Sequence, residues 1–300
     1  MKKILIVGGS GFVGSSLASS YNLQKHEIHL TTHEQINEFN FPQTKIDLMQ
    51  ESDKLIELIY KTTPNVVVHT VAFPSVDFCE TNPEKAHYLH VEVTRKIKDA
   101  CLKTGSKIIY LSTDAVFDGA LDLKSKYKED DKTNPISHYG KTKLDAEKIL
   151  LESSSNVILR TTVIYGWHKR SRFTNWVLSN LCKNQQVPTF TDQYNTPTLI
   201  DDLIFTIQKI IQKDISGLYH AVGRTCISRY KFGLLLAKRF GFPEELIRPV
   251  TSKERKQDAP RPVNGCLENH KLENLINYKF CELETGIDKI CKQKSFNKFF

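Results

Sequence analysis

A tyrosine and a lysine, Tyr139 and Lys143, stand four residues apart in the stretch SHYGKTKLDAEKIL at 137–150. The stretch has the pattern of a helix, so both side chains lie on one helix face. A tyrosine hydroxyl ordinarily has a pKa of about 10, and a neighbouring ammonium favours the phenolate. The pair can therefore act as a general acid or base near neutral pH. The same spacing also occurs on ordinary solvated helices.

Two hydroxyl side chains, Ser112 and Thr113, end the apolar run in IIYLSTDAVFDG at 108–119. The run has the composition of a strand that leads into a loop. Parallel sheets bind their ligands beyond the carboxyl ends of the strands. A hydroxyl at this point can hydrogen-bond a substrate carbonyl beside Tyr139.

Three glycines are spaced three apart in VGGSGFVGSSL at 7–17, between a strand-like run and a helical pattern. A tight turn here needs positive φ, and a pyrophosphate can approach the backbone closely only where side chains are absent. The helix start adds free N–H groups and a positive dipole end. This context favours a dinucleotide site over a plain β–α turn. We expect the site to comprise Gly8, Ser10, Gly11, Phe12, Val13 and Gly14.

The end of the second expected strand bears on the choice of dinucleotide. NAD-binding proteins usually place an acidic residue there to hold the ribose 2′-hydroxyl. The aligned position in HLTTHE is Thr32, followed by His33. Without a carboxylate there is no repulsion against a 2′-phosphate, so we expect NADP(H). NAD(H) stays open, because Glu34 could supply the carboxylate.

Strand and helix patterns alternate along the first half of the chain. We expect strands at 3–7, 27–31, 44–47, 66–69, 107–112, 157–160 and 217–221. We expect helices at 13–23, 53–60, 83–102, 139–151, 173–183, 200–213, 228–240 and 283–292. Asn82 can cap the long helix, with Pro83 in its first position and Gly105 at its end. The order predicts an α/β fold, a Rossmann-type doubly wound parallel sheet.

The alternation of strands and helices breaks down after residue 165, where helical patterns are separated by irregular loops. One more strand-like run, at 217–221, suggests that the chain returns to the sheet. We therefore expect a dinucleotide-binding Rossmann domain that comprises residues 1–165 and about 198–222. A smaller substrate-binding lobe would comprise about 166–197 and 223–300.

Composition narrows the function classes. The chain has 300 residues, of which 40% are hydrophobic and 25% charged, and its formal net charge is +8. A basic surface suits anionic partners, yet no dense Lys/Arg block supports nucleic-acid binding. The apolar run at 4–7 is too short for a signal peptide, and no stretch is long enough to span a membrane.

Seven cysteines are scattered through the sequence, at Cys79, Cys101, Cys182, Cys226, Cys266, Cys281 and Cys291. Their odd number and the lack of a C-x-x-C pair argue against a zinc site and a disulfide scaffold. A reducing cytoplasm is the expected location. His87 and His90 are three residues apart, but the sequence shows no third metal ligand near them. We therefore expect both to be polar residues on a helix surface and not a metal site. The acidic run 129–131 is expected to be a solvated turn, and the tail 292–300 a frayed terminus.

Longer motifs follow one another in a distinctive order: HTVAFPSVDFCETNPEKAHYLH, LSTDAVFDG, YKEDDKTNPISHYGKTKLDAEK, ILRTTVIYG, NTPTLIDDL, GLYHAVG and APRPVNGCLENHKLENLINYKF. This order resembles the dTDP-4-dehydrorhamnose reductase family, in the extended branch of the short-chain dehydrogenase/reductase superfamily. The resemblance covers nearly the whole chain. The STDAVFDG and APRP stretches are more specific than the glycine loop.

The resemblance implies reduction of a 4-keto group on a nucleotide-diphospho-6-deoxysugar, with dTDP-4-dehydrorhamnose as the first candidate. Tyr139 would protonate the carbonyl oxygen, and Thr113 would hydrogen-bond it. Lys143 would hold the nicotinamide ribose and lower the pKa of the tyrosine. Further residues that the resemblance places against the cofactor are Asp47, Leu48, Thr70, Val71 and Ala72. It places Val76 and Asp77 beside the sugar, and Arg261 in a loop near the nucleotide, where a surface salt bridge is the alternative. Asp114 and Trp167 are further candidates for contact with the substrate.

Three positions depart from the family pattern. Ala115 stands where an aromatic residue is common, Val163 where a tryptophan is common, and His90 where a structural asparagine is common. Trp167 either replaces one of the missing aromatic residues or only packs. These departures bear on the identity of the sugar more than on the chemistry.

Two other functions stay open. One is a nucleotide-sugar epimerase or dehydratase of the same superfamily, for which Asp114 is the only adjacent acid. The other is a non-catalytic NADP-binding regulatory subunit, because the β subunit of methionine adenosyltransferase is similar to this family. Intact Thr113, Tyr139 and Lys143 argue for catalysis. A homodimer is common for this fold, which is analogy alone.

Overall fold

The computed structural model describes residues 1–20, 26–34 and 39–293. Its internal contacts divide the chain into two compact units. Unit 1 comprises Met1–Thr113, Ser137–Arg160 and Thr206–Tyr219, and unit 2 comprises Asp114–Ile136, Thr161–Phe205 and His220–Phe300. No helix among the described residues is long and apolar enough to cross a membrane.

Unit 1 contains a seven-stranded sheet and most of the helices that cover it. Its strands are β1 (Lys2–Val7), β2 (His26–Thr32), β3 (Gln43–Lys45), β4 (Val66–His69), β5 (Lys107–Thr113), β6 (Val157–Thr161) and β11 (Gly217–His220). Its helices are α1 (Phe12–Ser20), α2 (Ser52–Thr62), α3 (Val76–Thr81), α4 (Pro83–His87), the π-helix η1 (Tyr88–Glu92), α5 (Val93–Thr104) and α6 (His138–Leu151). Helix α8 (Ile200–Lys213) begins in unit 2 and ends in unit 1.

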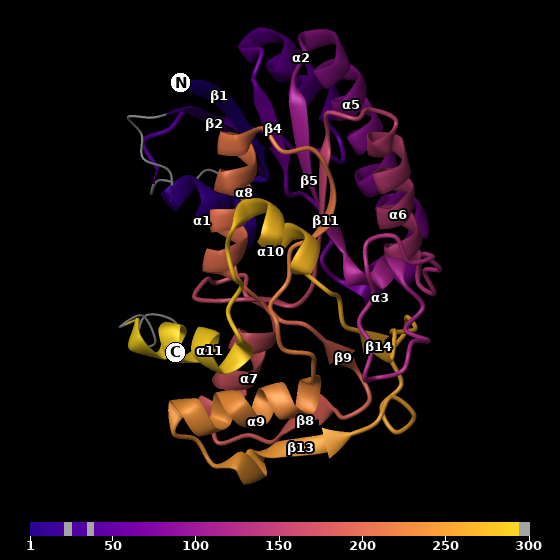
Figure 1. Cartoon of the computed structure of the whole chain (residues 1–300), viewed down its shortest axis with the longest axis vertical. Coiled ribbons are helices and arrows are strands. Elements are labelled where there is room, and N and C mark those ends of the chain that lie inside the picture. The colour runs from indigo at the N-terminus through magenta and orange to yellow at the C-terminus, as the bar shows by residue number, and fades with distance from the viewer. Residues whose placement is uncertain (21–25, 35–38, 294–300) are drawn as a thin grey trace. The chain divides into compact units, whose positions relative to one another are not determined.

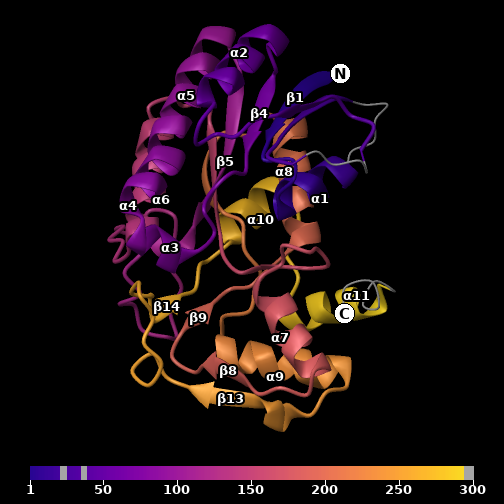
Figure 2. The same ribbon diagram turned by 180° about the vertical axis from the view of Figure 1, so that it is seen from behind.

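The strand order in this sheet is β11-β6-β5-β4-β1-β2-β3. β1 pairs in parallel with both β2 and β4, and β4 in turn pairs in parallel with β5. Helices α2, α5 and α6 lie on one face, and α1 with α8 on the other (Figures 1 and 2). Connections that run to both sides of β1 are those of a doubly wound sheet. The predicted Rossmann-type fold is confirmed.

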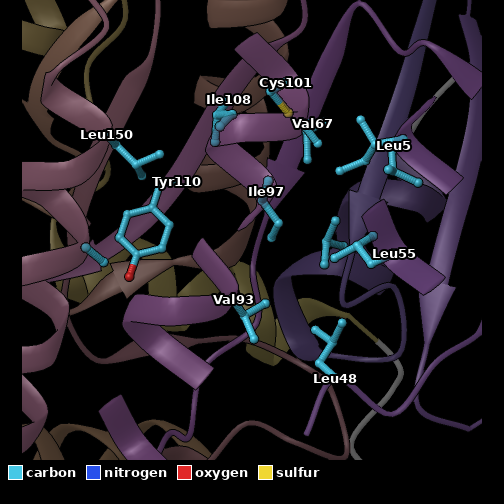
Figure 3. Close-up of a cluster of buried hydrophobic side chains, with 14 of the residues drawn as sticks. Leu5, Leu48, Leu55, Val67, Val93, Ile97, Cys101, Ile108, Tyr110 and Leu150 are labelled. Atoms are coloured by element: carbon cyan, nitrogen blue, oxygen red, sulfur yellow. The ribbon is translucent and has the colours of Figure 1, made fainter. Parts of the chain in front are cut away.

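Apolar side chains from both layers form the core of unit 1. Val67 and Ile108 from neighbouring strands meet Ile97 and Cys101 of α5 (Figure 3). β4 is buried at every residue, as expected for a central strand covered by helices on both faces. This packing anchors the carboxyl ends of β1, β4 and β5, which are the positions from which the candidate site is built.

The predicted long helix at 83–102 is interrupted by the π-helix at Tyr88–Glu92. Pro83 occupies the first position of α4, and Gly105 ends α5 in the left-handed conformation with φ +69°, both as predicted. The predicted cap at Asn82 is wrong, because this side chain makes no capping hydrogen bond to α4. Its amide donates instead to the carbonyl of Phe78, so it ends α3.

Unit 2 is built from short strands and four helices. The strands pair as β7 (Ile164–Tyr165) with β10 (Thr198–Leu199), β8 (Val187–Phe190) with β13 (Ile247–Val250), and β9 (Tyr194–Asn195) with both β12 (Ile227–Ser228) and β14 (Asn264–Gly265). The helices are α7 (Phe173–Cys182), α9 (Arg229–Phe240), α10 (His270–Ile276) and α11 (Leu283–Lys292), with 3-10 turns at Asp114–Val116 and Glu244–Leu246. None of these short strands was predicted, because two to four residues carry no periodic signal.

The segment 114–136 belongs to unit 2, although the sequence-based division placed it in the Rossmann domain. Its hydrogen bonds explain this: the amide of Tyr127 donates to the carbonyl of Cys266 at 2.8 Å, and the amide of Glu268 donates to the carbonyl of Tyr127 at 2.8 Å. The Asp114 carboxylate accepts from Asn195 Nδ2 at 2.6 Å. The assignment of unit 2 to substrate binding stays a prediction.

One disulfide lies in unit 2, between Cys226 and Cys266. The two residues adjoin β12 and β14, which flank β9 on either side, and their Cα atoms are 5.6 Å apart. The argument against a disulfide scaffold did not anticipate this single bond, because strand pairing brings together cysteines 40 residues apart in sequence. The other five cysteines form no disulfide.

We expect Cys226→Ser to lower the free energy of unfolding by about 2–4 kcal/mol relative to the oxidised protein, because the cross-link restricts the unfolded chain. Urea denaturation monitored by circular dichroism measures the change. The wild type in excess reductant should match the variant. Cys182→Ser, at an exposed free cysteine, is the control and should leave the midpoint unchanged. Equal stability of oxidised and reduced wild type would contradict the prediction.

Candidate active site

The glycine loop forms a tight turn between β1 and α1. Gly8 has φ +95°, a conformation that side chains disfavour, and its carbonyl accepts from the amide of Gly11 at 2.9 Å. A Cβ on Gly14 would lie 2.2 Å from the Gly8 oxygen, so the helix can approach the turn only without one. Ser10 and Val13 are buried here, whereas Phe12 begins α1 and is half-buried.

This turn has the features that a dinucleotide pyrophosphate requires. It places the start of a helix beyond a parallel strand, with backbone in place of side chains. At the end of β2, Thr32 is buried, and its hydroxyl has no hydrogen-bond partner among the described residues. His33 beside it is exposed. A buried hydroxyl in place of a carboxylate fits a cofactor whose ribose carries a phosphate.

The segment after β4 lies against the glycine turn. Thr70 donates from its amide and from its hydroxyl to the carbonyl of Val7, at 3.0 and 2.8 Å. A Cβ on Gly8 would meet Val71 Cγ2 at 2.7 Å, and Val71 also packs against the unit 1 core. Ala72 follows, half-buried. The structure thus brings the two predicted cofactor segments side by side.

Asp47 and Leu48 have structural roles. Asp47 Oδ1 accepts from the amide of Met49 at 2.9 Å, and its carbonyl accepts from Gln50 and Glu51. Leu48 is buried in the unit 1 core. Their proposed contacts with the cofactor stay predictions.

Tyr139 and Lys143 lie in α6, which packs on β5. The helix begins at His138 because the Ser137 side chain caps it, accepting from the amide of Gly140 at 3.2 Å. Thr113 is the last residue of β5 and is buried. Tyr139, one turn before Lys143, remains half-buried. The strand end and the first two turns of the helix therefore supply the predicted catalytic groups.

Lys143 is buried, with only 2% of its surface exposed. Its Nζ donates to the carbonyl of Leu111 at 2.6 Å and lies 3.9 Å from the ring centroid of Tyr110. Burial lowers the pKa of Lys143 from 10.5 to about 7, although the Glu147 carboxylate opposes the shift. Glu147 is itself held by Arg160, whose Nη2 lies 2.8 Å from Oε2. Burial of the charged form of Lys143 next to Tyr139 is therefore electrostatically unfavourable.

Two buried histidines near Lys143 were not predicted as part of the site. Burial, and secondly the charge of Lys143, lowers the pKa of His69 to about 3 and that of His90 to about 2. The prediction that His90 is a helix-surface residue is wrong, because only 1% of it is exposed. Its spacing from Ala86, Val93 and Ile97, which are buried on the same helical stripe, was the signal that could have placed it inside. His87, by contrast, is exposed and lies 3.3 Å from Glu92.

The residues predicted to touch the substrate fall in different parts of the chain. Val76 and Asp77 form the first turn of α3 in unit 1, after the Ser75 cap. Asp114 and Arg261 lie in unit 2, where Arg261 Nη1 donates to the carbonyl of Ala259 at 2.7 Å. All four substrate roles stay predictions.

Trp167 takes the packing alternative in unit 2. Its indole N–H donates to the carbonyl of Ile290 at 2.7 Å, and its ring stands edge-on to Phe240. It packs against the apolar core of the unit. Ala115 is buried, and Val163 has φ +43°, which is unusual for a β-branched residue. Contact of Trp167 with a sugar stays a prediction.

Among the described residues, no group of three His, Cys, Asp or Glu side chains is arranged to hold a metal ion. Glu129 of the acidic run accepts from the amide of His220 at 2.9 Å, and Asp131 accepts from the amide of Lys128 at 2.7 Å. These contacts are those of a structured turn. The predicted frayed tail lies largely outside the described residues.

Comparison with known proteins assigns the family. A family model described as the RmlD substrate binding domain matches residues 1–296. The chain belongs to this family. The resemblance to dTDP-4-dehydrorhamnose reductases is thereby confirmed, and the parallel-sheet fold agrees with it.

Relatives of this chain carry names with different functions. A dTDP-4-dehydrorhamnose reductase of Aggregatibacter actinomycetemcomitans is 29% identical, over 97% of this chain and 98% of its own length. The methionine adenosyltransferase 2 subunit beta of Xenopus laevis is 32% identical, over 73% of this chain and 67% of its own length. The crystal structure of a Bacillus anthracis dTDP-4-dehydrorhamnose reductase in complex with NADP superposes with a TM-score of 0.86 at 22% identity, covering 96% and 98% of the two chains. That likeness shows the fold.

The lowered pKa of Lys143 predicts how stability depends on pH in the RmlD-family fold without cofactor. Between pH 7 and about 10 the unfolded lysine keeps its proton while the folded one loses it, so the unfolded state binds more protons. Stability should therefore rise with pH. We expect the wild type to gain up to about 1.4 kcal/mol per pH unit relative to Lys143→Met.

Urea denaturation of both proteins at pH 7, 8 and 9 measures this gain. Lys141→Met, at an exposed position of the same helix, serves as the matched control and should follow the wild type. A stability difference between wild type and Lys143→Met that stays constant with pH would refute the lowered pKa.

Proposed function

We propose that this protein reduces the 4-keto group of a nucleotide-diphospho-6-deoxysugar with a nicotinamide cofactor, preferably NADPH. The first candidate substrate is dTDP-4-dehydrorhamnose, which would yield dTDP-L-rhamnose. The observation that carries the proposal is the placement of Thr113 at the end of β5 with Tyr139 and Lys143 on the helix packed against that strand. The named activity of the Aggregatibacter relative supports it.

Each group in this arrangement has a defined task. The cofactor would supply a hydride to the carbonyl carbon. Tyr139 would give its hydroxyl proton to the carbonyl oxygen, and Thr113 would donate a hydrogen bond to the same oxygen. Lys143 would hold the ribose of the cofactor and, as an ammonium, stabilise the tyrosinate left behind. Glu147 favours that ammonium, because its carboxylate raises the pKa of Lys143 against the effect of burial.

The cofactor segments would be the glycine turn and the residues after β4, with Thr32 at the ribose end. The NADP complex of the Bacillus anthracis structure supports NADPH. A cytoplasmic location and a homodimer stay predictions.

A second candidate is a non-catalytic NADP-binding subunit. The observation that favours it is the 32% identity to the β subunit of methionine adenosyltransferase 2. Under this reading the site would bind cofactor without turnover. An epimerase or dehydratase is less well supported, since the Asp114 carboxylate is already hydrogen-bonded to Asn195.

We expect the purified protein to consume NADPH when mixed with enzymatically generated dTDP-4-dehydrorhamnose, and Tyr139→Phe to be slower by about 10²-fold or more. Loss of the nicotinamide absorbance measures the rate. Stoichiometric loss of NADPH excludes an epimerase or dehydratase, which regenerate their cofactor. NADPH binding without turnover, together with copurification of a larger enzyme, would overturn the reductase proposal in favour of the subunit.

We also expect a lower Michaelis constant for NADPH than for NADH, because β2 ends at Thr32 and not at an acidic residue that would repel a 2′-phosphate. Thr32→Asp should raise the constant for NADPH about tenfold, which corresponds to about 1.4 kcal/mol, and should affect NADH little. Thr32→Ser, which keeps the hydroxyl, is the control. A preference of the wild type for NADH would contradict the assignment.

A further inference from the structure

His90 lies in the middle of the π-helix Tyr88–Glu92, with its side chain directed into unit 1. Single π-turns within α-helices are rare and are frequent at functional sites. Helix α6 packs against this π-helix. The irregular turn therefore places an imidazole against the helix that carries Tyr139 and Lys143.

Both ring nitrogens of His90 are engaged. The amide of Phe73 lies 2.9 Å from Nε2, and the hydroxyl of Thr142 lies 2.8 Å from Nδ1. The Thr142 hydroxyl also lies 3.0 Å from the carbonyl of Tyr139, to which it can only donate. An amide can likewise only donate, so Nε2 must accept.

These constraints give every hydrogen bond one direction. Nε2 carries no proton, so the neutral ring carries its proton on Nδ1 and donates it to Thr142. Thr142 then uses its own proton on the carbonyl of Tyr139. The hydrogen-bond chain therefore runs from Phe73 through His90 and Thr142 to Tyr139. None of its bonds can exchange donor and acceptor.

This series of hydrogen bonds joins two parts of the candidate site that are far apart in sequence. Phe73 directly follows the segment 70–72 that lies against the glycine turn, whereas Thr142 adjoins Lys143. The His90 ring also stands edge-on to the Tyr139 ring, with centroids 5.7 Å apart. One side chain thus contacts both the ring and, through Thr142, the backbone of the tyrosine.

The charge state of His90 is compatible with this role. Its pKa lies at about 2 because of burial, with further contributions from Lys143 and His69. The ring therefore stays neutral over the pH range in which an enzyme works. A protonated ring would lose the bond from Phe73 and would place a second cation near Lys143.

We propose that His90 is a positioning residue that holds the first turn of α6, and with it the Tyr139 ring, against the segment that follows β4. This inference rests on the proposed function, because it assigns His90 a task in the same reaction. It differs from simple core packing in requiring one defined tautomer and an intact hydroxyl on Thr142.

Kinetics of His90 variants test the proposal. We expect His90→Leu to lower kcat at least tenfold while the KM for the sugar nucleotide changes less than threefold, and to shift the pH profile of kcat. His90→Asn keeps one acceptor and one donor and should recover most of kcat. His87→Leu, on the exposed side of the same helical segment, is the matched control and should behave as the wild type. Unchanged kcat and pH profile in His90→Leu would overturn the proposal.

Thr142 variants separate the hydrogen-bond chain from packing. Thr142→Val should lower kcat as His90→Leu does, whereas Thr142→Ser should retain it. The double variant His90→Leu/Thr142→Val should be no slower than His90→Leu alone, because both changes break one chain. Independent, multiplicative losses would show that the two residues do not act together, and would overturn the proposal.

A measurement that needs no turnover keeps this inference distinct from the proposed function. Nitrogen-15 NMR of the imidazoles should show His90 as the neutral Nδ1–H tautomer from pH 5 to pH 9. The Nε2–H tautomer, or titration of His90 within that range, would overturn the chain even in an active enzyme. Absence of turnover in the wild type with the expected tautomer would instead refute the reductase and, with it, the catalytic task of His90, while the hydrogen-bond chain would stand.

Discussion

Burial of the Lys143 ammonium is the constraint on which the surroundings of the active site depend. A buried cation without compensation is strongly unfavourable. Here the carbonyl of Leu111 accepts from it, the face of Tyr110 lies under it, and the Glu147 carboxylate favours its charged form. Glu147 in turn needs Arg160, because a lone buried carboxylate would be equally costly. The contacts of the Lys143 ammonium and of its neighbour Glu147 thus connect α6 with the ends of β5 and β6.

Burial, and secondly the charge of Lys143, keeps the two neighbouring histidines neutral. His69 and His90 contribute hydrogen bonds without adding positive charge, because burial and Lys143 both lower their pKa values. His69 binds the hydroxyl of Thr94 at 3.0 Å, on the helix that continues from the π-turn holding His90. Uncharged side chains from β4 and the π-helix therefore surround the candidate catalytic residues Tyr139 and Lys143. A cofactor that reached Lys143 would meet a site already arranged around a single cation.

In unit 2, several residues that the sequence suggested for the substrate site make contacts within the unit itself. Trp167, a candidate for replacing a missing aromatic residue, uses its indole N–H and its ring within the core of the unit. Asp114 is held by Asn195, and Cys226 and Cys266 join the strands on either side of β9. The departures at Ala115 and Val163 lie in this unit as well. Two of the three departures from the family pattern therefore lie in the unit whose short strands the sequence did not predict.

The sequence by itself determined the parallel sheet, the glycine turn and the pairing of Tyr139 with Lys143. These depend on interactions between residues close in sequence: alternating apolar patterns, a turn that excludes Cβ atoms, and two side chains one helical turn apart. The tertiary structure alone decided the hydrogen-bond chain from Phe73 to Tyr139, the packing of Trp167 and the disulfide between Cys226 and Cys266. In each case the partners are separated by tens of residues, and the outcome depends on which elements pack together. A π-turn within a helix, or a strand pairing that brings two cysteines within bonding distance, leaves no periodic signal in the sequence.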